Sequence, residues 1–188
     1  TALGYQALYT ATNVIEIKTH LALFFYSNTE GEGNVAVGDY SLESNTTGNC
    51  NIAMGTYSLR SNPTGHSNIA VGDYSLRRNA TGYCNIAMGF YSLQSNTTGY
   101  SNAAMGYYSL HYNTTGRFNT AMGRYSLGSN TTGNYNTAVG NNAGSGDSIG
   151  ENATSTDSLY LGSNTKALAS GDTNEIVIGY QATGVGSN

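Results

Sequence analysis

A strict repeat of 17 residues is the feature that most limits what this chain can fold into. Six blocks run from Asn34 without a slip, and each reads Asn-x-Ala-h-Gly-x-Tyr-Ser-Leu, with h either Val or Met, before a segment ending in Thr-Gly. We number repeat positions from one at Asn34, which puts a marker glycine at position five. These glycines are Gly38, Gly55, Gly72, Gly89, Gly106 and Gly123. A unit this short excludes the helix pairs of helical repeat proteins, which need about 33 residues.

Each unit contains two short stretches of alternating character, such as Ile52-Ala53-Met54 and Tyr57-Ser58-Leu59. They are separated by Gly and by Asn-Thr-Thr-Gly, whose Asn and Gly tolerate turn geometry and positive φ. We therefore expect an all-β chain, a parallel β-solenoid or β-roll of about eleven 17-residue coils, with two strands in each coil. Disorder is the alternative for a chain with 25 Gly, but fixed β-branched and aromatic positions disfavour it.

The marker glycines also divide the chain. Steps of 17 back from Gly38 reach Leu21 and then Gly4, which predicts degenerate N-terminal coils over residues 1–33. Regular repeats occupy residues 34–140. The next glycine after Gly140 is Gly162, a step of 22 that predicts an insertion or turn over 141–157 and C-terminal coils over 158–188. Because the chain begins inside a repeat, we expect it to be a segment of a longer protein.

Stacking at the inter-strand spacing of about 4.8 Å would turn each repeat position into a column. Position nine gives an apolar column, Leu42, Leu59, Leu76, Leu93, Leu110 and Leu127. Position four gives a second column with all four methionines, Val37, Met54, Val71, Met88, Met105, Met122 and Val139. Position seven gives a tyrosine column, Tyr40, Tyr57, Tyr74, Tyr91, Tyr108 and Tyr125.

The small and amide side chains form columns of their own. We expect Ala at position three and Ser at position eight to face away from the apolar columns, against another chain or into a tight inner corner. Asn at positions one and twelve is expected to hydrogen-bond from coil to coil. Four apolar side chains in each coil make a thin interior against a backbone entropy cost of ~1–2 kcal/mol per residue. Self-association would supply the missing burial.

The motif Asn-x-Ala-h-Gly-x-x-Ser-Leu resembles the head repeats of trimeric autotransporter adhesins, which build an intertwined trimeric β-roll. Thr1–Leu8 and Asn113–Gly140 are similar to repeats of bacteriophage tail fibres. Ser158–Asn188 resembles the segment that precedes an endosialidase-type, self-cleaving intramolecular chaperone in such fibres. The resemblance implies a homotrimeric structural fibre, the shaft or distal part of a tail fibre, located in the virion and binding a host-cell receptor or glycan. A bacterial cell-surface adhesin or extracellular filament is the alternative.

Charge and motifs exclude several other classes. The net charge of −4 gives no reason to expect a nucleic-acid partner, and no apolar run is long enough for membrane insertion. No enzyme signature is present, and we expect no cofactor. His20, His66 and His111 fall at different repeat positions, so they predict no metal site. Asp39 and Asp73 share position six two coils apart, and we interpret them as solvated turn residues.

The remaining candidates are cysteines, sequons and exposed rings. Cys50 and Cys84 lie two coils apart, about 9–10 Å, which is too far for a disulfide within one chain, although a contact between copies stays open. Sequons at Asn45, Asn79, Asn96, Asn113, Asn130 and Asn152 could carry glycans or simply form the repeated turn. Position fourteen gives a threonine column, Thr47, Thr64, Thr81, Thr98, Thr115 and Thr132, which would permit ice binding. The irregular tyrosines are the candidates for partner contact, Tyr83, Tyr100, Tyr107 and Tyr112.

Overall fold

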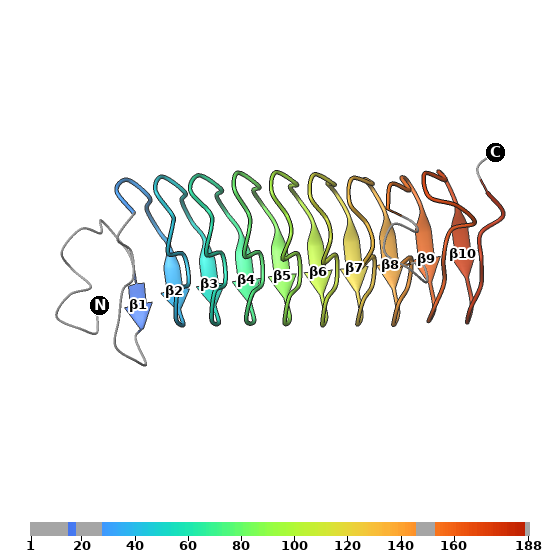
Figure 1. Ribbon diagram of the computed structural model, residues 1–188, viewed down its shortest axis with the longest axis horizontal. Helices are drawn as coiled ribbons and strands as arrows, with labels where there is room; N and C mark the ends of the chain where they lie inside the picture. Colours follow the sequence, from blue (N-terminus) through green and yellow to red (C-terminus); the bar gives the residue numbers. More distant parts are fainter. Residues whose placement is uncertain (1–14, 18–27, 146–152, 187–188) are drawn as a thin grey trace.

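The chain folds as a parallel β-solenoid of about eight turns set 17 residues apart. The computed structural model describes residues 15–17, 28–145 and 153–186, and over these ranges the chain is all-β without a helix. The coils stack along one axis from β1 to β10 (Figure 1). The predicted β-solenoid is therefore confirmed.

Ten strands of three residues each form one parallel sheet in sequence order. They are β1 Ile15–Ile17, β2 Val35–Val37, β3 Ile52–Met54, β4 Ile69–Val71, β5 Ile86–Met88, β6 Ala103–Met105, β7 Thr120–Met122, β8 Thr137–Val139, β9 Leu159–Leu161 and β10 Ile176–Ile178. From β2 to β8 each residue pairs with the residue at the same repeat position of the next coil, for example Ala53 with Ala70. Thr137 pairs with Leu159, so the sheet absorbs the 22-residue step without losing register.

The step of 17 that leads back to Leu21 is wrong for the first described coil. Ile15 pairs with Val35 across 20 residues, so β1 lies three residues earlier than the repeat predicts. In the regular coils the marker position has no room for a side chain, because a Cβ atom at Gly38 would lie 2.7 Å from the Gly55 carbonyl carbon. Gly4, Leu21 and the other residues of 1–14 and 18–27 lie outside the described residues, and the count of eleven coils stays a prediction.

Each described regular coil contains one strand, so the expectation of two strands per coil is wrong. Tyr57 and Leu59 have φ values of 60° and 47°, in the left-handed region. This backbone turns the chain, because Tyr57 N donates to Asp39 O of the preceding coil and Leu59 N donates to Ser75 O of the following coil. The left-handed region costs a non-glycine residue about 1–2 kcal/mol, which hydrogen bonds to both neighbouring coils offset.

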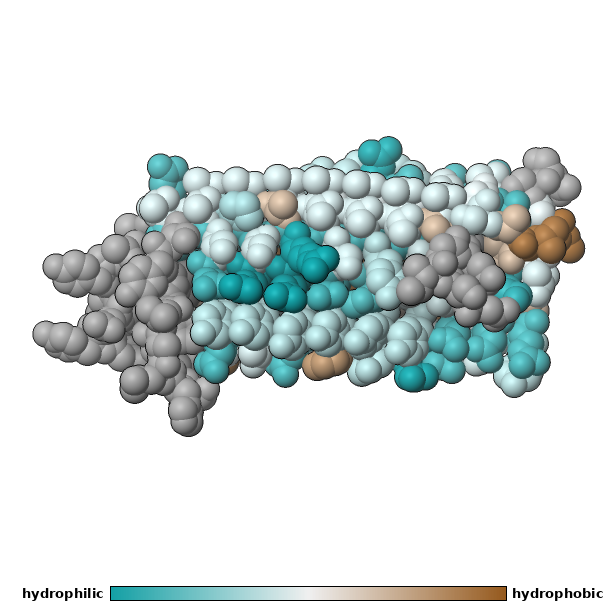
Figure 2. Space-filling view, viewed as in Figure 1, coloured by the Kyte–Doolittle hydropathy of each residue, from teal (hydrophilic) through white to brown (hydrophobic). Residues whose placement is uncertain are grey.

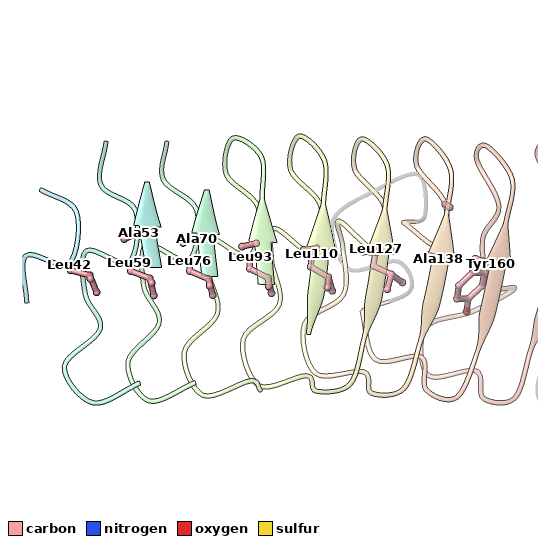
Figure 3. Packing of buried hydrophobic residues seen from close by; sticks show 14 of the residues in the cluster. Leu42, Ala53, Leu59, Ala70, Leu76, Leu93, Leu110, Leu127, Ala138 and Tyr160 are labelled. Carbon is pink, nitrogen blue, oxygen red and sulfur yellow. The ribbon is translucent and has the colours of Figure 1, made fainter. Parts of the chain in front are cut away.

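The interior consists of the alanines at position three and the leucines at position nine (Figure 3). Ala53, Leu59 and Ser58 are all fully buried, whereas Met54 is 43% exposed. Ala at position three faces away from the Val and Met of position four, as predicted, but it shares the interior with the leucines of position nine, so that part of the prediction is wrong. Ser58 is buried as well, and its hydroxyl donates to Gly55 O at 2.8 Å. Tyr-Ser-Leu is not a strand, in which alternate side chains would point to opposite faces, because its Tyr and Leu have left-handed backbone.

Two columns of buried asparagine run through the coils, as expected. At position twelve, Asn79 Nδ2 donates to Asn62 Oδ1 at 2.7 Å and to Gly82 O at 2.8 Å. At position one, the Asn68 side chain also donates to Gly82 O, so this carbonyl joins the two columns. A Cβ atom at Gly82 would lie 2.2 Å from Asn79 Oδ1. The turn glycine is thus required for space, and its φ is not positive as the turn motif had suggested.

Candidate functional site

The tyrosine column at position seven forms a continuous aromatic row on the outside of the coils. Neighbouring rings lie 4.7 to 5.2 Å apart by centroid, and the Tyr40 and Tyr57 planes differ by 3°. Each ring therefore covers a face of the next ring. Because the faces are covered, the row offers a partner mainly ring edges and hydroxyl groups. Burial against neighbouring tyrosines raises the pKa of the Tyr108 hydroxyl above its ordinary value.

The structure divides the four tyrosines predicted as partner contacts between two places. Tyr83 and Tyr100 stack on each other at position sixteen, 4.7 Å apart, and both are half-buried. Tyr107 and Tyr112 are exposed at positions six and eleven of one coil. Tyr108 and His111 lie between them in an unbroken run of ring contacts. The four residues do not form a single site.

The outer face of the sheet carries two apolar rows. Side chains at positions two and four flank the inward alanine of each regular strand and point away from the interior, which gives an outer-inner-outer burial pattern. Ile86 is 38% exposed and Met88 is 44% exposed on one strand. We call this surface the outer sheet face. Its members at position two are Val35, Ile52, Ile69, Ile86, Ala103, Thr120 and Thr137, and position four supplies the predicted Val/Met column.

Arginine, glutamine and histidine side chains line the other side of the tyrosine row. Arg60 binds Glu43 of the preceding coil, and this hydrogen bond raises the pKa of the Arg60 guanidinium. Arg77 lies over both Tyr57 and Tyr74, with its Cζ 5.5 Å from each ring centroid. Figure 2 shows one long face of the rod with its most hydrophilic patch over the coils of β3 to β5. Sequence patterns did not single out these arginines, because they fall at variable repeat positions.

His111 is the one described histidine that is buried. Its Nδ1 lies 3.1 Å from Tyr91 O. Burial lowers the pKa of the His111 imidazole below 6.5, and the nearby charge of Arg78 lowers it further. His66 instead stacks on Tyr83 at the surface, and His20 lies outside the described residues. In residues 28–145 and 153–186, no three His, Cys, Asp or Glu side chains are arranged to hold a metal ion.

The other acidic and thiol candidates lie at the surface of the turns. Asp73 Oδ1 accepts a hydrogen bond from Thr56 N at 2.8 Å, so its carboxylate secures the turn of the preceding coil. Cys50 and Cys84 are exposed free thiols with positive φ.

The described part of the chain also contains no helix of the length and hydropathy that a membrane span needs.

The sequons lie on the interior asparagine column. Asn45, Asn79, Asn96, Asn113 and Asn130 are fully buried and hydrogen-bonded through their amides. A folded coil therefore has no access for a glycan at these five positions. Asn152 lies outside the described residues. The threonine column at position fourteen is exposed in every coil, as a single row beside the turn glycines.

Comparison of this chain with protein-family models, curated proteins and solved structures gives no match.

Proposed function

We propose that this chain is a non-enzymatic structural fibre segment that associates with other copies of itself, most simply as a homotrimer. In this proposal it forms the shaft or distal part of a phage tail fibre and contributes to host-cell attachment in the virion. The outer sheet face is the observation that carries the proposal. A stable rod that presents rows of Ile, Val and Met to water is typical of one protomer of an assembly.

The dimensions of the outer sheet face suit a lengthwise contact between rods. From β2 to β8 there are six inter-strand steps, which at about 4.8 Å each make a strip roughly 30 Å long. Contiguous apolar patches above a few hundred Å² mark interaction sites on most soluble proteins. Burying the strip would also add to a thin core of one Ala and one Leu in each coil. Further copies present the same strip in the same spacing, so three parallel rods can turn their strips toward a common axis and bury them along their length.

A cell-surface adhesin or extracellular filament could use the same coil and the same contact. The two proposals differ in what else the complete protein contains. A self-cleaving chaperone and a virion-attachment domain would support the tail fibre, whereas a membrane anchor would support the adhesin.

Light scattering after size-exclusion chromatography tests the association. We expect three times the 19.7 kDa of one chain for the unmodified protein and a single chain for Met88→Lys, because a buried ammonium without a partner is costly. Thr98→Lys is the matched control, since Thr98 is exposed on a turn away from the sheet, and it should keep the assembled mass. Circular dichroism verifies that both variants fold. A monomeric unmodified protein at tens of micromolar would overturn the proposal.

A further inference from the structure

A cationic strip borders the tyrosine row in the coils of β3 to β6. We define it by Arg60, Arg77, Arg78, Gln94 and His111, which occupy positions ten and eleven of four consecutive coils. From the first coil to the last there are three inter-strand steps, or roughly 15 Å. We propose that this strip binds an acidic polysaccharide, a chain of sugars that carry carboxylate or sulfate groups.

The charge distribution favours an anionic ligand at this place. The chain has a net charge of −4 and only seven Lys and Arg residues, yet three of the arginines lie in two neighbouring coils. Arg60 is paired with Glu43, and this is the one ion pair that the described residues form in the strip. Arg77 and Arg78, one coil further, are therefore available for a ligand. A guanidinium presents a planar fork of donors that matches carboxylate and sulfate oxygens.

The tyrosine row holds the guanidinium groups of Arg60 and Arg77 in place and separates the strip from the acid at position six. Arg77 stacks over Tyr57 and Tyr74, which limits its freedom before a ligand arrives. Asp73 stands at position six, and its carboxylate is engaged by Thr56 N. Tyr91 contacts Phe90 at position six and His111 at position ten, so the row lies between the two sets of side chains.

The far end of the strip offers groups that suit a sugar more than a phosphate backbone. Gln94 and His111 are buried, and Tyr91 O fixes the His111 ring, so these two side chains form the floor of the strip beneath its exposed groups. Tyr112 contacts His111 and is 37% exposed, so part of its ring can pack against a sugar. Nucleic-acid binding would need a larger cluster of Lys and Arg than three residues on an acidic protein. An extended acidic sugar chain along the rod axis fits these features best.

The inferred polysaccharide site rests on the proposed attachment function. Binding of the protein to immobilised polysaccharides tests the site. The probes are polygalacturonate for carboxylates, dextran sulfate for sulfates, and uncharged dextran, all at physiological salt. We expect binding to at least one acidic polymer and none to dextran. Arg77→Gln/Arg78→Gln should weaken that binding by roughly tenfold or more, as expected for the loss of charged hydrogen bonds.

Arg117→Gln/Arg124→Gln is the matched control, because it removes the same charge from two arginines that also lie over tyrosine rings, at positions sixteen and six. It should change the affinity by less than about twofold. Equal losses in the two variants, no binding to either acidic polymer, or equally strong binding to single-stranded DNA would each overturn the inference. Light scattering on the same samples reports the assembly separately, so the fibre proposal can survive the failure of this one.

Discussion

The regular coils and the C-terminal coils fill the same interior in different ways. In residues 34–140 each coil supplies Ala at position three and Leu at position nine. At the junction, Gly144 takes the leucine position and Tyr160 takes the alanine position of the next coil (Figure 3). A Cβ atom at Gly144 would lie 2.6 Å from Tyr160 Cδ2. The large ring occupies the space that the missing leucine leaves, so the two departures from the repeat compensate each other.

The asparagine columns also differ between the regular coils and the C-terminal coils. Ser158 and Glu175 replace Asn at position one of the last two described coils. Of the buried side-chain atoms in the described residues, Asn130 Oδ1, Ser155 Oγ and Glu175 Oε2 have no hydrogen-bond partner. All three lie from the last regular coil onward. The packing and hydrogen bonds of each coil therefore depend on the residues of its neighbours. A substitution in one coil must be repeated in the next coil or compensated by a second change there.

The largest expected effect on stability comes from replacing either Gly144 or Tyr160 without the other. Tyr160→Ala should lower the free energy of unfolding by about 3–5 kcal/mol, because it leaves a cavity beside Gly144. Gly144→Leu alone should also destabilise, because the added side chain collides with the ring. The double variant restores the regular pattern, and it should recover most of the loss. Gly144 has φ of 62°, near the 47° of Leu127, so the backbone accepts leucine.

Urea unfolding of the four proteins measures this coupling. Additive losses in the double variant would show that the junction does not use the same packing as the regular coils, and the proposed compensation would be wrong.

The next largest effect concerns the asparagine column of the regular coils. Asn79→Ala removes the bonds to Asn62, Gly82 and Asn96, and it should cost about 2 kcal/mol or more because buried partners are left unsatisfied. Thr81→Ala destroys the same sequon at an exposed position and should cost less than about 0.5 kcal/mol. Thermal unfolding distinguishes the two. Equal losses of stability in Asn79→Ala and Thr81→Ala would mean that the buried asparagine contributes no more to stability than the exposed threonine of the same turn.

Much of the fold follows from the 17-residue period, whereas the direction of the side chains in Tyr-Ser-Leu does not. Gly at position five and Asn at positions one and twelve fix the coil length, the parallel register and the asparagine columns. The direction of side chains could not be read from Tyr57-Ser58-Leu59, because left-handed φ values for Tyr and Leu are set by contacts with neighbouring coils. The prediction therefore counted the Val/Met column at position four with the interior, whereas it lies on the outer sheet face. The cationic strip was missed for another reason, since Arg60 and Arg78 occupy positions that vary from block to block.

A smaller effect is expected from His111 when the pH changes. Its pKa is lowered in the folded protein, chiefly by burial, so below pH ~6.5 the unfolded chain binds more protons than the folded chain. Stability should therefore fall as the pH decreases below that value and stay level above it. His111→Gln introduces the residue that Gln94 already supplies at the same position of the preceding coil. The variant should lose less stability than the unmodified protein between pH 7.5 and 5.5, and identical losses in urea unfolding would contradict this assignment.

The smallest effect tests the left-handed residues that distinguish the regular coils. Ser67 is exposed at position seventeen with φ of 56°, whereas Gly33 holds the same position with φ of 66°. Ser67→Gly should raise the free energy of unfolding by about 0.5–1 kcal/mol, because relief of the backbone strain exceeds the added entropy of the unfolded chain. Ser61→Gly is the matched control at an exposed residue without positive φ, and it should destabilise slightly, since glycine there adds only unfolded-state entropy. The backbone hydrogen bond from Ser67 N to Asn49 O is kept in Ser67→Gly, so destabilisation of both variants in thermal unfolding would show that the left-handed backbone at Ser67 stores no strain that glycine relieves.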